Sequence, residues 1–202
     1  MKKILLLILL ALPSVTFAQD IYSVSLFVEF TGEVLSDIAG TSVASAGDVN
    51  GDGYDDVIVG ASQSDDGGVS NTGAVYLIYG QASTLTSASL STVVEFTGQA
   101  LATSDVAGNA IASAGDVNGD GYDDILVGAT GNDGAFSNAG AVYLIYGQAA
   151  PMTSGTLLSK SVKFTGEVAS DAAGNSVASA GDVNNDGYDD ILIGARGNDF
   201  GG

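Results

Sequence analysis

The sequence predicts an all-β protein, a partial β-propeller built from about three four-stranded blades. Three observations support this prediction. A long segment of sequence recurs three times, each full recurrence contains four short β-rich runs, and turn-rich segments of Gly, Asn, Asp and Ser separate those runs. After the first 18 residues, no stretch shows a persuasive helical period, so helices are not expected to contribute to the core.

The repeat is long, and its three copies are very similar in sequence. "VEFTGEVLSDIAGTSVASAGDVNGDGYDDVIVGA" from Val28 recurs with small changes from Val94 and from Val162, and the acidic runs within it begin at Asp48, Asp116 and Asp182, 68 and 66 residues apart. "GAVYLIYGQA" follows the first two copies, from Gly73 and Gly140. Repeats of this length set the architecture, because each unit buries its apolar faces against its neighbours.

In the first repeat the expected strands cover residues 42–49, 56–61, 73–80 and 92–98. "VIVGA", "ILVGA" and "ILIGA" are apolar on both strand faces, as expected of strands covered on both sides. "SVASAG" consists of small residues and suits the crowded place where several sheets converge. Four strands per unit, stacked face to face around an axis, describe a propeller blade.

The chain is expected to begin with a secretory signal. Lys2 and Lys3 precede the apolar run 4–12, and the small-residue end at Ala18 resembles a cleavage site, so residues 1–18 are interpreted as a signal peptide. A membrane-spanning helix is the weaker interpretation, because the apolar run is short and Pro13 interrupts it. The expected location is therefore secreted or at the cell surface, with no membrane insertion in this segment.

The remaining residues, 19–202, are expected to form a propeller fragment. Its blade units are placed at about 42–98, 110–167 and 176–202, and an orphan outer strand at about 26–32 would close a ring by completing the last blade. Two full blades, a partial third and an orphan strand do not close a ring of four to eight blades. We therefore expect the sequence to be the front of a longer protein.

Charge and composition exclude some partners. Five Lys and Arg stand against 24 Asp and Glu, for a formal charge of −19, and removal of the signal would leave three cations and a charge of −21. Such a polyanion repels nucleic acid and anionic lipid. An apolar content of 46% argues against disorder. Cysteine is absent, so disulfides cannot cross-link the chain and another kind of cross-link would be useful.

The acidic runs predict metal-binding loops. When Asp48 is counted as position one of "DVNGDGYDD", side-chain oxygens fall at positions one, three, five and nine, a glycine at six permits a tight bend, and the carbonyl of position seven can also bind. This alternation of oxygens is how a loop surrounds a hard cation with six or seven ligands. The absence of His and Cys disfavours zinc and copper, so calcium is the expected ion, one per repeat and up to three in this segment.

The expected ligands share the same loop positions in all three repeats. They are Asp48, Asn50, Asp52, Tyr54, Asp56, Asp116, Asn118, Asp120, Tyr122, Asp124, Asp182, Asn184, Asp186, Tyr188 and Asp190. An EF-hand would need glutamate at position twelve, where the repeats have Val59, Val127 and Ile193. A solvated Asp-Gly turn that binds nothing is the alternative, and threefold repetition of every oxygen position disfavours it. Asp55, Asp123 and Asp189, at position eight, are expected to support the loop rather than bind the ion.

The loop, the "VGA" strand after it and the "AGTSVASAGD" run before it resemble FG-GAP repeats, the units of the integrin alpha-subunit propeller and of many secreted bacterial proteins. The resemblance implies a seven-bladed ring with calcium in the loop between the first two strands of several blades. The sequence departs from the family name at two points: Ala39-Gly40, Ala107-Gly108 and Ala173-Gly174 replace Phe-Gly, and Ser62, Thr130 and Arg196 replace the proline of Gly-Ala-Pro.

Catalysis is not expected. Without His or Cys the usual nucleophile–base pairs cannot form. The acid pairs Asp65 with Asp66 and Glu33 with Asp37 are interpreted as solvated loop charges rather than a glycosidase pair.

Strand tyrosines are expected to pack between the blades. The alternating residues Tyr76, Tyr79, Tyr143 and Tyr146 fit such packing better than a sugar-stacking platform.

The expected function is a secreted, calcium-rigidified binding or adhesion module with an extracellular protein or glycan ligand. The alternative is a non-catalytic propeller arm of a larger exported hydrolase, phospholipase-like or acting on polysaccharides. Residues beyond Gly202 would discriminate between the two.

Overall fold

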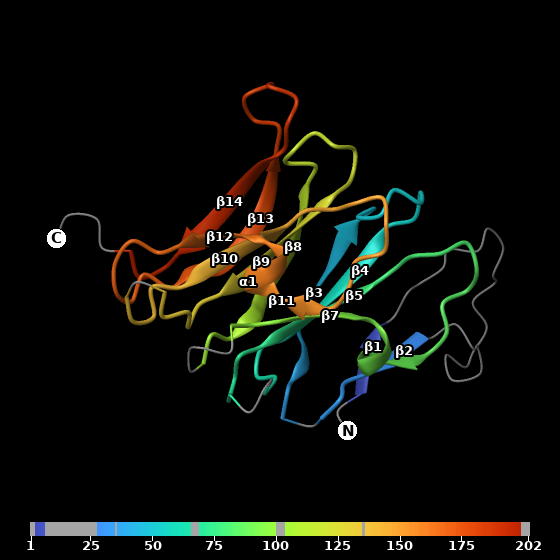
Figure 1. Cartoon of the computed structure of the whole chain (residues 1–202), viewed down its shortest axis with the longest axis horizontal. Helices are drawn as coiled ribbons and strands as arrows, with labels where there is room; N and C mark the ends of the chain where they lie inside the picture. The colour runs from blue at the N-terminus through green and yellow to red at the C-terminus, as the bar shows by residue number, and fades with distance from the viewer. Residues whose placement is uncertain are drawn as a thin grey trace, which may run out of the picture.

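A computed structural model describes residues 3–6, 28–34, 36–65, 69–99, 104–134 and 136–198, and Figure 1 shows their arrangement. The expected fragment and its orphan strand also include residues 19–27 and 199–202, which lie outside the described residues. The strands are β1 (Lys3–Leu6), β2 (Val28–Thr31), β3 (Ala39–Gly47), β4 (Asp56–Ala61), β5 (Ala74–Ile78), β6 (Ala88–Ser89), β7 (Val94–Thr97), β8 (Ala107–Gly115), β9 (Asp124–Ala129), β10 (Ala141–Ile145), β11 (Gly155–Thr156), β12 (Val162–Thr165), β13 (Ala173–Gly181) and β14 (Asp190–Ala195). Among the described residues, helix is limited to a 3₁₀ turn at Leu90–Thr92 and the single turn α1 at Leu157–Lys160.

The repeats form successive antiparallel sheets. The first repeat contributes β3, β4, β5 and β7 in that spatial order, and the second contributes β8, β9, β10 and β12 in the same order. The third contributes the two-stranded sheet β13–β14. Pairing registers agree between repeats, because Tyr76 lies opposite Val59 just as Tyr143 lies opposite Val127. This arrangement of four-stranded sheets confirms the predicted partial β-propeller.

Two short parallel strands pair with the outer strands β7 and β2. β11, from the segment that follows β10, pairs in parallel with β7 of the first repeat, so the first sheet has five strands. β6 pairs with β2 in the same way. Two-residue strands without an alternating pattern have no clear sequence signal, and the sequence analysis did not anticipate them.

The hydrophobic core lies between adjacent sheets. Ile58, Val75 and Phe96 of the first sheet share one buried cluster with Ile125 and Tyr143 of the second. A further cluster joins Leu126 and Val142 of the second sheet to Val177 and Ile191 of the third. Strands buried on both faces therefore need apolar residues at successive positions, which explains "VIVGA" and "ILVGA".

The first strand of each repeat is the crowded one. β3 contacts β8, and β8 contacts β13, as small side chains permit. Each of these strands begins three residues earlier than expected, because the register shifts between its Ala-Gly start and the following Ser or Ile. Gly40 has a φ of +88° at this irregularity. Glycine adopts that conformation without strain, whereas the sequence predicts a strand that begins only after it, at residue 42.

The outer strand β2 has a partner on each side. In the pairing of β1 with β2, Lys3 lies opposite Thr31 and Ile4 lies opposite Phe30. The third and fourth strands of the other two sheets pair in the same register, with Val75 opposite Phe96 and Val142 opposite Phe164. β1 thus takes the place of a third strand beside β2, although its residues lie within the expected signal peptide. Of the expected signal peptide, residues 1, 2 and 7–18 lie outside the described residues. No helix in the described ranges has the length and apolarity needed to span a bilayer.

Candidate metal centre

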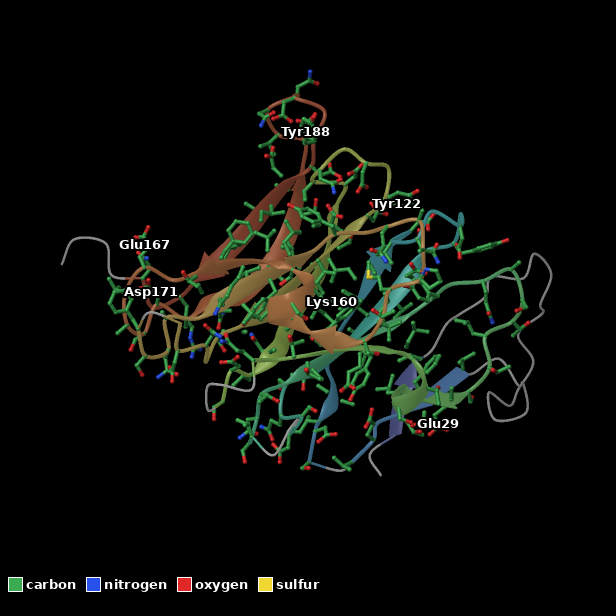
Figure 2. The ribbon with its side chains drawn as sticks, viewed as in Figure 1. Glu29, Tyr122, Lys160, Glu167, Asp171 and Tyr188 are labelled. Atoms are coloured by element: carbon green, nitrogen blue, oxygen red, sulfur yellow. The ribbon has the colours of Figure 1, made fainter. Side chains whose placement is uncertain are left out.

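The three acidic loops join the first and second strands of each repeat. They connect β3 to β4, β8 to β9 and β13 to β14, so strand direction places them at the same end of their sheets. Figure 2 shows Tyr122 and Tyr188 at this end, while Glu167 and Asp171 lie at the other end of the third sheet. The expected ligands of each repeat are therefore brought together on one turn.

In the first loop, carboxylate oxygens organise the backbone. Asp48 accepts hydrogen bonds from the backbone N–H of Asp52 at 3.0 Å and of Gly53 at 2.8 Å. Asp52 accepts from the N–H of Tyr54 at 3.0 Å, and the Asn50 oxygen accepts from the N–H of Asp52 at 2.9 Å. Such side-chain-to-backbone bonds fold a short acidic segment into a turn.

The same network recurs in the other two loops. Asp116 accepts from the N–H of Asp120 and Gly121, and Asp182 accepts from the N–H of Asp186 and Gly187. These N–H groups, that of Gly187 foremost, lower the pKa of the Asp182 carboxyl. In the third loop, the turn thus stabilises the charged form of Asp182.

Position nine ties the loop to the sheet. Asp56 is fully buried and accepts one hydrogen bond at each oxygen, from the N–H of Val49 at 3.1 Å and of Gly80 at 2.7 Å. Asp124 does the same with Val117 and Gly147. Burial raises the pKa of Asp56 to about 6, although the two N–H groups oppose the shift, and it raises the pKa of Asp124 to about 6 as well.

The side chains of the three loops are of the kind that binds a hard cation. Every side chain at positions one, three, five and nine offers oxygen, and a carboxylate oxygen that accepts one hydrogen bond keeps a second lone pair. Within the ranges that the structure describes, however, no three acidic side chains gather closely enough to hold a metal ion. The loops therefore match calcium in ligand chemistry, while their carboxylates are engaged with backbone N–H groups.

Position eight connects neighbouring blades. Asp123 Oδ2 accepts a hydrogen bond from the N–H of Asp48 at 2.8 Å, and Asp123 N–H donates to the Asp48 carbonyl at 3.2 Å. Asp189 forms the same pair of bonds with Asp116. Each position-eight aspartate after the first thus holds the loop of the preceding blade. The loop that each of these aspartates contacts belongs to the neighbouring repeat, not to its own.

The tyrosine at position seven also contacts the preceding loop. A Cβ placed on Gly51 would lie 2.5 Å from Tyr122 Cε1, and one placed on Gly119 would lie 2.6 Å from Tyr188 Cε1. The two rings therefore lie directly over glycines at position four. Gln148 N–H adds a bond of 2.9 Å to the Val49 carbonyl. Sequence reasoning missed these contacts because they join residues more than 60 positions apart.

The other candidate residues lie away from the loops. Tyr76 and Tyr143 are buried in the core, and Tyr79 accepts a hydrogen bond from the N–H of Met152 at 2.7 Å. Tyr146 is exposed. Of the acid pairs, Asp37 is buried rather than solvated, whereas Asp66 lies outside the described residues.

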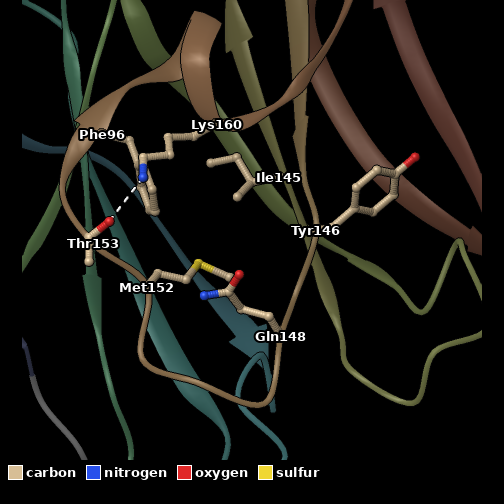
Figure 3. A pocket seen from close by; sticks show the side chains of 7 residues that line it. All are labelled: Phe96, Ile145, Tyr146, Gln148, Met152, Thr153 and Lys160. Carbon is tan, nitrogen blue, oxygen red and sulfur yellow. Dashed lines mark hydrogen bonds between the residues drawn. The ribbon is translucent and has the colours of Figure 1, made fainter.

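A small hollow lies between β7 and β10. Its volume is about 70 Å³, far below the roughly 300 Å³ of a small-molecule pocket. Figure 3 shows its lining and the hydrogen bond of 2.9 Å from Lys160 Nζ to Thr153 Oγ1. The lining residues are Phe96, Ile145, Tyr146, Gln148, Met152, Thr153 and Lys160. We assign no site to this hollow.

Comparison with known proteins identifies the repeat. The FG-GAP repeat family matches residues 39–78, 107–145 and 173–202, more than half of the chain. Integrin alpha-5 of Xenopus laevis is 32% identical over 175 residues, integrin alpha-IIb of Mus musculus 35% over 176 and integrin alpha-V of Gallus gallus 30% over 181.

These alignments cover 84%, 82% and 88% of this chain, but only 16% of each integrin. The chain therefore spans about a sixth of the length of the relatives that it matches. Each matched FG-GAP segment begins at the first residue of β3, β8 or β13 and includes the acidic loop that follows. The chain belongs to the FG-GAP repeat family and is similar to integrin alpha subunits.

Proposed function

We propose that this chain is a calcium-binding propeller segment that acts outside the cell as a binding or adhesion module. The observation that carries the calcium proposal is the threefold repetition of one loop, with the same backbone hydrogen bonds to positions one and five in every copy. Asp48, Asn50, Asp52, Tyr54 and Asp56 would bind the ion in the first loop, and their equivalents would do so in the others.

Calcium would offset repulsion within each loop. Three carboxylates at positions one, five and nine repel one another, and a bound divalent ion reduces that repulsion. Because Asp123 and Asp189 fasten each loop to the next blade, an ion that orders a loop also stabilises the contact between blades. In a chain without cysteine, such ions would take the part of disulfide cross-links.

The adhesion proposal rests on family membership and on integrin alpha subunits being among its relatives. It implies an extracellular protein or glycan ligand and export through the N-terminal signal. We infer no enzymatic role, which the absence of His and Cys from the sequence supports. Binding of the secreted protein to glycan and extracellular-matrix protein arrays, with and without a calcium chelator, tests this proposal, and a lack of binding in both conditions would contradict it.

The calcium proposal is tested by thermal unfolding. Calcium should raise the melting temperature, because it binds the native state. This gain should be abolished when Asp56, Asp124 and Asp190 are replaced by Ala. The same change, however, also removes the hydrogen bonds from Val49 and Gly80 to Asp56 and the equivalent bonds to Asp124. Substitution of the exposed Asp52, Asp120 and Asp186 by Asn is the sharper variant, because it should remove the calcium gain with little loss in calcium-free buffer. An equal gain in this variant would contradict the assignment.

A further inference from the structure

The face of the third sheet that points away from the second sheet is apolar and uncovered. Ile58 and Leu126 occupy the same strand position in the first two sheets, and both are fully buried in clusters shared with the sheet that follows. Leu192, their equivalent in β14, is 58% exposed. Among the described residues β14 pairs with β13 alone, whereas β4 and β9 each pair with a third strand as well. The third sheet thus leaves open the surface that the structure buries twice between blades.

The third loop also lacks the contact that the first two loops receive from the next repeat. An added Cβ on Gly47 would meet the carboxylate of Asp123, which comes from position eight of the second repeat. In the same way, an added Cβ on Gly115 would meet the carboxylate of Asp189. The equivalent Gly181 has no atom within 4 Å of an added Cβ. An apolar surface that continues a series of buried interfaces marks a place where another sheet docks.

The first sheet has the complementary open face. Val43 of β3 is 53% exposed, whereas its equivalent Ile111 is 8% exposed and packs in the cluster that the first two sheets share. β2 and Leu90 pack on β4 and β5, yet Val43 beside them stays uncovered. Asp55, the position-eight aspartate of the first repeat, is exposed. The third sheet of a second copy therefore has a place beside β3, in the way that β3 itself lies beside β8.

One residue makes the third loop different from the other two. The rings of Tyr122 and Tyr188, at position seven, lie over the glycine at position four of the preceding loop, where an added Cβ would be 2.5 or 2.6 Å away. Position four of the third loop is Asn185, whose φ of 60° keeps the left-handed backbone that Gly51 and Gly119 adopt. The Asn185 Cβ therefore fills the space that a tyrosine ring from a docking sheet would need.

We propose that the open face of the third sheet fits the first sheet of a second copy of this chain at every point but one, and that Asn185 prevents the two from joining. Position seven of the first sheet is Tyr54, whose ring would meet the Asn185 Cβ in a junction like the two covered ones. Apolar burial and the Asp55 carboxylate would otherwise favour the contact, as their equivalents do within the chain. Such a head-to-tail contact between copies builds rings or filaments, which Asn185 suppresses.

Self-association of the full chain, measured by analytical ultracentrifugation, tests the proposal. Tyr54→Ala removes the ring and should lower the dissociation constant of self-association about tenfold or more relative to the wild type. Asn185→Gly should do the same from the other side of the contact, and folding is not at risk because glycine adopts a positive φ without strain. Asn185→Ala is the matched control: it retains the Cβ and should associate no more tightly than the wild type.

A mixing experiment tests the direction of the contact. The double variant Asn185→Gly with Asp55→Ala has an open third sheet but a first sheet without its position-eight carboxylate. Alone, it should associate less tightly than Asn185→Gly, because its first sheet is a poor partner. Mixed with the wild type, whose first sheet is intact, it should form a one-to-one dimer. This dimer ends there, because the wild-type third sheet still carries Asn185.

Three results would overturn the proposal. The first is equal self-association of the wild type, Asn185→Gly and Asn185→Ala, because the Cβ would then exclude nothing. The second is a monomeric state of both Asn185→Gly and Tyr54→Ala, with each variant shown to be folded by its cooperative thermal unfolding. The third is a mixture of the double variant and the wild type that contains no dimer, because the contact would then not be head to tail.

Discussion

Asp123 and Asp48 are joined by two hydrogen bonds across the boundary between blades. The Asp123 carboxylate accepts from the Asp48 N–H at 2.8 Å, and the Asp123 N–H donates to the Asp48 carbonyl at 3.2 Å. Asp189 and Asp116 repeat the pair at 3.0 and 3.1 Å. The end of the sheets that carries the acidic loops is thus also where one blade is fastened to the next.

Removal of one fastening carboxylate should destabilise the fold. We expect Asp123→Ala to lower the free energy of unfolding by about 1.5–3 kcal/mol, the usual value for a hydrogen bond to a charged group. Chemical denaturation measures this change. Asp55→Ala is the matched control, because Asp55 is the exposed first-repeat equivalent, and it should change stability by less than about 0.5 kcal/mol. Equal losses in the two variants would show that position eight does not fasten blades.

The glycine under Tyr122 should not tolerate a side chain. Gly51 has a φ of +71°, and an added Cβ would lie 2.5 Å from the tyrosine ring. Gly53 has a φ of +87° with no atom within 4 Å of an added Cβ. We expect Gly53→Ala to cost the left-handed backbone strain alone, about 1–2 kcal/mol, and Gly51→Ala to cost more.

The excess cost of Gly51→Ala should depend on the tyrosine. In a Tyr122→Ala background, where the ring is absent, Gly51→Ala should cost no more than Gly53→Ala. Denaturation of the single and double variants measures this coupling. If the excess persists without the ring, the proposed contact is not its cause. Asn185 occupies position four in the third loop with a φ of 60°, so the loop backbone itself accepts a side chain there.

Stability of the calcium-free protein should fall as pH rises from about 4 to about 6. Burial raises the pKa of Asp56 and Asp124 from their usual 3.8 to about 6, so the folded state holds protons that the unfolded state has released. Their contribution is therefore full below about 3.8 and is lost as pH passes about 6. Thermal unfolding across this range, in chelator, measures the slope. A melting temperature that rises from pH 4 to pH 6 would contradict this sign.

Processing of the N-terminus should expose one edge of β2. If residues 1–18 are a signal peptide, intact mass measurement of the exported protein should give a chain that begins at Gln19. The strand β1 would then be absent, and the edge of β2 that it covers would be free to pair with another strand. A mature protein that retains Met1 or Lys2 would show that the first 18 residues are not removed.

Much of the fold could be predicted because the repeat is visible in the sequence. Spacing between Asp48, Asp116 and Asp182 placed three equivalent units, and "VIVGA" indicated strands buried on both faces. Boundaries near Ala39 could not be placed, because Gly40 lies in a strand irregularity that has the composition of a turn. The parallel strands β6 and β11 were missed because two residues show no periodicity.

Only the positions within each acidic loop could be predicted from the sequence. Loop positions follow from one short segment, whereas Asp123 reaches Asp48 and Tyr122 reaches Gly51 across some 70 residues, and local spacing cannot reveal such contacts. The sequence predicts a solvated loop charge at Asp37, yet the structure buries this side chain.

The central claim is that each of the three acidic loops binds one calcium ion. A crystal structure of the exported protein grown with calcium tests this claim most directly. The account predicts anomalous density in each acidic loop, with oxygens of Asp48, Asp52 and Asp56, or of their equivalents, about 2.3–2.6 Å from the ion. Water alone in all three loops would contradict it.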